Sequence, residues 1–90
     1  MDKVHIIING FVQGVFFRSF IKERANELDL KGYARNLDRD KVEIIVEGHE
    51  AKINKFMEII KKGPPGAEVK DLKAVKQPYK GEFKQFTIRH

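Results

Sequence analysis

A short stretch near the N-terminus combines glycine, arginine and a change of hydrophobic pattern in a way that suits anion binding. It runs from Gly10 to Arg18 and reads G-F-V-Q-G-V-F-F-R. It follows a strand-like run, Val4–Asn9, and precedes a helix-like run, Phe20–Leu30. Backbone N–H groups of a strand–loop–helix connection point at an anion, and Gly14 allows an oxyanion close to the backbone. On spacing alone, an ordinary connection with a solvated arginine remains the simpler interpretation.

A second polar residue, Asn36, gives this stretch a partner for phosphoryl chemistry. Loop N–H groups and the planar guanidinium of Arg18 would together hold three phosphoryl oxygens. A carboxamide both donates and accepts hydrogen bonds, so Asn36 can orient a water without acting as a base. No acid–base pair is evident beside the loop, which suits an easy leaving group such as a carboxylate. A lone asparagine near a turn is otherwise typical of the turn itself.

The hydrophobic pattern predicts the strands that must position these residues. Alternation of apolar and polar residues predicts five strands: Val4–Asn9, Tyr33–Leu37, Val42–Val46, Ala67–Lys76 and a short one around Phe86 and Ile88. The alternation slips between Val69 and Leu72, which predicts a bulge or a bend in the fourth strand. Because the first strand carries isoleucine on both faces, we expect it to lie inside the sheet.

Apolar residues at helical spacing predict two helices. The first starts at Arg18 or Ser19 and ends over Asp29–Gly32, with Gly32 in its C-terminal turn. The second covers His49–Lys62 and is stopped by the G-P-P-G run that follows it.

The order of these elements is β-α-β-β-α-β with a terminal strand. It predicts an α+β fold: a ferredoxin-like βαββαβ sandwich with a mostly antiparallel sheet and two helices on one face. We expect residues 1–90 to form a single domain, since a chain of this length builds one core. In this topology the first and second strands both lie beside the third. Asn36, near the end of the second strand, is therefore expected to approach the Gly10–Arg18 stretch.

The composition excludes several kinds of site. The chain has no cysteine, which excludes disulfides, thiolate zinc sites and a cysteine nucleophile. Its three histidines share no metal-ligand spacing, so we expect no metal. No apolar run approaches the roughly 20 residues that span a bilayer, and the N-terminus lacks a signal-peptide pattern, so we expect a cytoplasmic protein without membrane contact. A net charge of +5 favours anionic partners.

Several segments together resemble the acylphosphatase family. They are the G-F-V-Q-G-V-F-F-R stretch, the G-Y-A-R-N segment at residues 32–36, the V-E-I-I-V-E-G strand at 42–48, the G-P-P-G-A-E-V segment at 63–69 and the terminal F-T-I-R-H. The resemblance covers essentially the whole chain.

The resemblance implies a small stand-alone enzyme that hydrolyses the carboxyl–phosphate bond of acyl phosphates by direct attack of water, without metal or organic cofactor. It implies that Arg18 binds the phosphate and that Asn36 positions the attacking water. It also implies a cradle of backbone amides, from Gln13, Gly14, Val15, Phe16 and Phe17. Inorganic phosphate would be product and competitive inhibitor, and a monomer is the default expectation. Carbamoyl phosphate, 1,3-bisphosphoglycerate, acetyl phosphate and phosphorylated aspartates on proteins all stay open as substrates.

The chain departs from the family pattern at a few positions. Phe11 stands where an arginine or lysine is frequent, Arg39 and Asp40 stand where the hairpin commonly carries Asp-Gly, and His90 replaces a frequent final tyrosine. Asp tolerates the left-handed conformation less well than Gly, so we expect the hairpin turn to differ. None of these positions is Arg18 or Asn36.

Two other interpretations compete with an enzyme. The same topology carries RNA-recognition modules, and the basic charge fits them, but those modules stack bases on aromatic residues of the first and third strands. Here the third strand has no aromatic residue and carries two carboxylates, Glu43 and Glu47, so we expect no nucleic-acid partner. The other interpretation is a non-catalytic ligand-binding domain that keeps the anion cradle, since similar domains also occur inside larger proteins.

Overall fold

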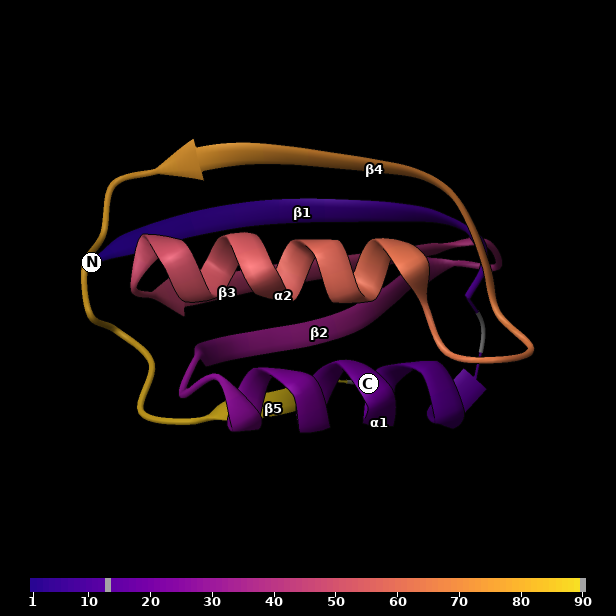
Figure 1. The fold of residues 1–90 in the computed structure, drawn as a ribbon, viewed down its shortest axis with the longest axis horizontal. Coiled ribbons are helices and arrows are strands. Elements are labelled where there is room, and N and C mark those ends of the chain that lie inside the picture. Colours follow the sequence, from indigo (N-terminus) through magenta and orange to yellow (C-terminus); the bar gives the residue numbers. More distant parts are fainter. Residues whose placement is uncertain (13, 90) are drawn as a thin grey trace.

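Two helices cover one face of a five-stranded sheet (Figure 1). The computed structural model describes residues 1–12 and 14–89. The elements are β1 (Asp2–Phe11), α1 (Gly14–Glu27), β2 (Lys31–Asp38), β3 (Lys41–Gly48), α2 (Glu50–Lys62), β4 (Glu68–Gln77) and β5 (Phe86–Arg89). The strand order is β4-β1-β3-β2-β5, and every pair is antiparallel except β2 and β5. The predicted ferredoxin-like sandwich with a mostly antiparallel sheet is confirmed.

The core lies between the sheet and the helices. β1 is flanked by β4 and β3, as its two apolar faces predict. α1 packs on β2 and β5, and α2 packs on β3 and β4. The residues that β1, β3 and the two helices contribute to this core are Val4, Ile6, Ile8, Val42, Ile44, Val46, Phe17, Ile21, Ala25, Ile53, Phe56 and Ile60. Each large apolar side chain buried in this way contributes about 1.5–3 kcal/mol, so this packing fixes both helices on the sheet.

The predicted start of the first helix is wrong. α1 begins at Gly14, before the expected start at Arg18 or Ser19. Phe17 leads the buried stripe of α1 and is 1% exposed, so the turn that contains Phe17 must already be helical to face the sheet. Residues 14–17 are therefore the first turn of a helix and not part of a loop.

The predicted role of Gly32 is also wrong. Gly32 lies within β2 at a φ of 143°, and a Cβ there would lie 1.9 Å from the carbonyl oxygen of Ile45. Close approach of β2 and β3 therefore requires this glycine. The left-handed residue after α1 is Asp29, with a φ of 55°, and a short polar side chain tolerates that conformation better than most.

The predicted bulge in the fourth strand is confirmed. Asn9 pairs with Asp71 while Gly10 pairs with Val69, so Lys70 is the extra residue on β4. The backbones approach closely here, because a Cβ on Gly10 would lie 2.1 Å from a carbonyl oxygen of β4. Gly10 therefore holds the end of β1 against β4 at the place where the chain turns towards α1.

At the other end of the sheet, a buried carboxylate anchors the segment that leads to β5. Glu47 is 2% exposed. Its oxygens accept hydrogen bonds from the backbone N–H groups of Lys80, Gly81 and Phe83, at 3.3, 3.1 and 3.4 Å. The ring of Phe83 packs edge-on against Tyr33 on β2, with 5.9 Å between ring centroids. Because an ionised acceptor strengthens such bonds, Glu47 holds this segment in place.

We predict that Glu47→Ala lowers the free energy of unfolding by about 2–3 kcal/mol, because three N–H groups lose a buried charged acceptor. Urea denaturation at neutral pH measures this loss. The matched control is Glu58→Ala, which removes an exposed carboxylate from α2 and should change stability by less than about 0.5 kcal/mol. Equal effects of the two substitutions would contradict the anchoring role of Glu47.

Candidate active site

Three parts of the chain that are distant in sequence lie at one end of the molecule (Figure 1). They are the passage from the end of β1 to the start of α1, the turn between β2 and β3, and the loop after α2. Val42 pairs with Ile8 on one side and with Asn36 on the other, so these residues form one row across three strands. The N–H of Gly10 donates to the carbonyl oxygen of Asp40 at 2.9 Å, which ties the end of β1 to the turn. The register thus brings the strand of Asn36 to the end of the sheet from which the chain enters α1.

The start of α1 has the electrostatics of an anion site. The first four N–H groups of an α-helix have no partner within the helix. Residues 14–17 supply the first turn of α1, and that turn contains no acidic residue, whereas α2 carries Glu50 in its first turn. A carboxylate in that place compensates the positive end of the helix dipole. α1 lacks this compensation from its own first turn. The predicted cradle amide of Gln13 lies outside the residues that the structure describes.

Arg18 directly follows this turn, and it is only 8% exposed. A guanidinium withdrawn from water requires acceptors or anions around it. A cation near the N-terminal end of a helix is also disfavoured by the helix dipole. A phosphoryl group bound at the start of α1 would counter this unfavourable effect of the dipole.

Asn36 lies where β2 leaves the core. Gly32 and Ala34 are buried beneath the helices, and strand alternation places Asn36 on the same face. Asn36 itself is exposed. Its amide therefore belongs to the helix-covered side of the sheet, at the end where α1 begins, and it is accessible to a solvent molecule.

A bulge that the sequence did not predict follows Asn36. Asn36 pairs with Val42 and Asp38 pairs with Lys41, so Leu37 is an extra residue on β2. Asp29 is the sole residue other than glycine with a positive φ in the described part of the chain, so the hairpin turn uses no left-handed residue. The turn therefore accommodates Arg39–Asp40 without the conformation that Asp-Gly usually supplies.

Two exposed aromatic rings flank the start of α1. Phe11 is 71% exposed and Phe16 is 74% exposed, in contrast to the buried Phe17. Phe16 lines a groove of about 170 Å³ together with Phe20 and Pro64. The entrance to the candidate site is therefore partly apolar, which suits a substrate that carries an organic group beside its phosphate.

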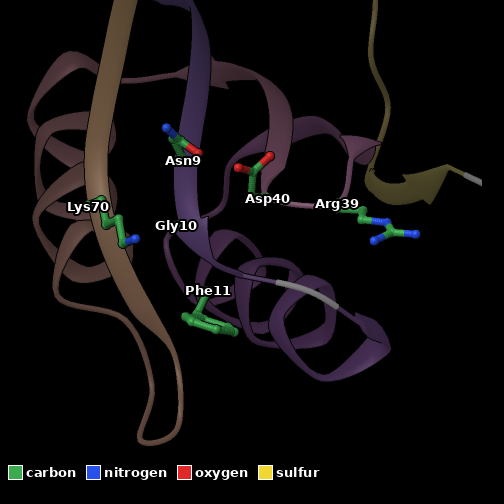
Figure 2. Close-up of a pocket in the computed structure, with 6 residues that line it drawn as sticks. All are labelled: Asn9, Gly10, Phe11, Arg39, Asp40 and Lys70. Carbon is green, nitrogen blue, oxygen red and sulfur yellow. The ribbon is translucent and has the colours of Figure 1, made fainter.

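A pocket of about 260 Å³ opens beside Phe11 (Figure 2). It is lined by Asn9, Gly10, Phe11, Arg39, Asp40 and Lys70. Sequence reasoning missed this pocket. The slip between Val69 and Leu72 was the available signal, but the pairing of Lys70 opposite the end of β1 depends on the register of β1 and β4, which a single sequence does not contain.

The ionisable residues on the uncovered face of the sheet belong to a separate cluster. Nε2 of His5 lies 2.8 Å from one oxygen of Glu43, and Nε of Arg35 donates to the other at 2.6 Å. Burial raises the pKa of Glu43, but the hydrogen bonds with His5 and Arg35 outweigh it and hold that pKa below its usual value. Arg35 is thus engaged on the face opposite to Asn36. Among the residues that the structure describes, no three His, Asp or Glu side chains gather as metal ligands would.

Comparisons with known proteins show similarity to acylphosphatases over nearly the whole chain. A family model described as Acylphosphatase matches residues 4–88. An acylphosphatase of Caldivirga maquilingensis is 44% identical over 91 aligned positions, which cover 98% of this chain and 94% of that protein. The crystal structure of acylphosphatase from Bacillus subtilis superposes with a TM-score of 0.94 at 34% identity, with both chains fully covered. The crystal structure of HypF from T. kodakarensis contains a similar region, with a TM-score of 0.86 and 36% identity, which covers all of this chain and 12% of that one.

Nothing in the described helices is both long enough and apolar enough to cross a membrane.

We predict that inorganic phosphate binds at the start of α1 and not at the start of α2, because Glu50 already compensates the latter. In a titration of ¹⁵N-labelled protein with phosphate, the amide resonances of residues 14–17 should shift and saturate. The amides of residues 50–53 are the internal control and should move only as much as with sodium chloride at equal ionic strength. Equal responses at both helix starts would contradict an anion site at α1.

Proposed function

We propose a mechanism that proceeds from one premise: this chain belongs to the acylphosphatase family. Its reaction is the hydrolysis of an acyl phosphate to a carboxylate and inorganic phosphate. What we propose is how the residues at the start of α1 and the end of β2 carry out this reaction. The observation that carries the mechanism is the first turn of α1, which lacks an acidic residue and is followed by the buried Arg18.

In the proposed complex, the phosphoryl group sits at the start of α1. Backbone N–H groups of Gly14, Val15, Phe16 and Phe17, together with that of Gln13, donate to its oxygens. The guanidinium of Arg18 supplies two further donors in a planar fork and neutralises charge. Phosphoryl transfer needs little covalent help from the protein, so most of the rate acceleration comes from this fixed set of donors.

Asn36 holds the attacking water. Its side-chain oxygen accepts a hydrogen bond from the water and its amide group donates to the substrate or to a second water. The water oxygen attacks phosphorus in line with the bond to the carboxyl oxygen. That bond breaks, its electron pair leaves with the carboxylate, and the protons of the water remain on the inorganic phosphate or pass to solvent. A carboxylate is the anion of an acid with a pKa of roughly 4–5, so it departs without a general acid.

Direct attack by water is supported by the positions of the possible alternatives. A serine on α1, Ser19, directly follows Arg18 and is the possible nucleophile nearest to it in sequence. It lines the groove that also contains Phe16. A serine needs an adjacent base to act as a nucleophile. His5 contacts Glu43 on the uncovered face of the sheet, and His49 precedes α2 at the opposite end of the molecule (Figure 1). Neither of these two histidines therefore assists Ser19, and the third, His90, lies outside the residues that the structure describes.

The proposal also includes the remaining expectations from the sequence. Residues 1–90 act as one domain and as a monomer in the cytoplasm, with no metal, organic cofactor, nucleic acid or membrane taking part. Inorganic phosphate competes with substrate because it occupies the same donors.

We predict that the wild-type protein hydrolyses benzoyl phosphate in the presence of EDTA and that inorganic phosphate inhibits competitively. Loss of benzoyl phosphate absorbance in the ultraviolet measures the rate. Absence of turnover under these conditions, or turnover that requires added metal, would contradict the proposal and would favour a non-catalytic phosphate-binding domain or a metal-dependent mechanism.

We predict different defects for the two site residues. Arg18→Ala should lower kcat/KM by at least about 10²–10³-fold and abolish phosphate binding, and Arg18→Lys should not restore it because an ammonium lacks the planar fork. Asn36→Ala should lower kcat by about 10²-fold, as expected for loss of positioning of the water, while phosphate still binds.

The matched controls are Arg24→Ala on α1 and Asn54→Ala on α2, which should retain wild-type rates. Thermal unfolding of each variant separates loss of function from loss of fold. Full activity in both Arg18→Ala and Asn36→Ala would overturn the assigned roles.

A further inference from the structure

The pocket beside Phe11 is lined by segments that adjoin the candidate site. Gly10 and Phe11 line it, and they end β1 immediately before the chain enters the first turn of α1. Arg39 and Asp40 line its other side, from the hairpin that also carries Asn36. The pocket therefore lies between the two segments that the mechanism uses, although neither Arg18 nor Asn36 lines it.

The β4 bulge directs a lysine to this pocket. Val69 and Leu72 both pack against the core. Regular alternation would leave one residue between two such positions, but the bulge leaves two, Lys70 and Asp71, on the outer side. Lys70 is exposed, and Figure 2 shows its side chain extending towards Gly10 and Phe11. Within the described residues, no ion pair includes Lys70.

The charges around the pocket are of opposite sign and lie on different walls. Lys70 brings an ammonium from β4, and Asp40 brings a carboxylate from the hairpin, directed towards Asn9 (Figure 2). The guanidinium of Arg39 points away from the pocket in the same view. Phe11 adds an exposed ring. The wall formed by Lys70 and Phe11 thus offers apolar surface that ends in one cation, which fits a short carbon chain that ends in an anion.

We propose that this pocket receives the acyl group of the substrate and that Lys70 selects acyl groups with a terminal anionic group, such as a carboxylate. The inference rests on the proposed function, since the pocket acts only if the phosphoryl group binds at the start of α1. A dicarboxylic acyl phosphate then spans the site: its phosphate lies on the α1 amides and Arg18, and its free carboxylate meets Lys70. The carboxylate of Asp40 repels the terminal anion of the acyl group, so the preference for charged acyl groups over uncharged ones is moderate.

The test compares acyl phosphates that differ in the charge of the tail. Succinyl and glutaryl phosphate carry a terminal carboxylate, and butyryl and pentanoyl phosphate are their uncharged counterparts. The measured quantity is the ratio of kcat/KM for the charged over the uncharged substrate of each pair, at neutral pH and low salt. In Lys70→Gln this ratio should fall about three- to tenfold, mainly through KM, as expected for loss of one partly exposed charged partner. In Asp40→Asn it should rise by about two- to threefold.

The matched control is Lys73→Gln, which removes the same charge from an exposed position further along β4, opposite Ile7. Its ratio should stay at the wild-type value. Ratios that change equally in Lys70→Gln and Lys73→Gln, or in neither, would overturn the role of Lys70. Failure of the wild-type protein to hydrolyse any of the four substrates would instead overturn the proposed function, so the two failures are distinguishable.

Discussion

The packing of α1 against the sheet is the constraint on which the candidate site depends. Phe17 is 1% exposed, and Ile21 and Ala25 are fully buried. α1 therefore cannot rotate about its axis or slide along it without exposing this stripe or opening a cavity. The same packing sets where the first N–H groups of the helix lie, beside the ends of β1 and β2 (Figure 1). Because Arg18 directly follows Phe17, apolar burial also fixes the position of the residue that we propose to bind the phosphate.

The features that depend on local pattern could be predicted from the sequence, and those that depend on register could not. Val69 and Leu72 are apolar and both pack against the core, although their spacing does not match regular strand alternation. The β4 bulge was therefore predictable from that spacing. The extra residue at Leu37 is visible only in the pairing of β2 with β3. The role of Gly32 also depends on register. From sequence alone, a glycine near a helix end is as consistent with a helix cap as with a strand position, and the close approach of Ile45 in β3 decides for the strand. The roles of the site residues came from family resemblance, and they remain predictions.

The two acids that hold segments of the sheet lie on the face opposite to Asn36 and the start of α1. Glu47 and Glu43 lie on the face that the helices do not cover, where each is engaged by hydrogen-bond donors from β1, β2 or the segment before β5. Asn36 and the start of α1 belong to the other side. A phosphoryl group carries up to two negative charges, so carboxylates close to it would oppose binding. Separation by the sheet lets the protein use buried and half-buried acids to hold its segments without weakening an anion site.

The proposed chemistry and the proposed acyl pocket also act on different kinetic quantities. In the proposed mechanism, the amide donors and Arg18 contact oxygens whose charge changes as the phosphorus–oxygen bond breaks, so their loss would affect the transition state. A contact between Lys70 and the far end of an acyl chain is the same before and during bond breaking, so it lowers KM without raising kcat. Substrate preference can then be altered by the charges at Lys70 and Asp40 alone. The residues that act on phosphorus stay the same, because no acid is needed for any carboxylate leaving group, whatever its tail.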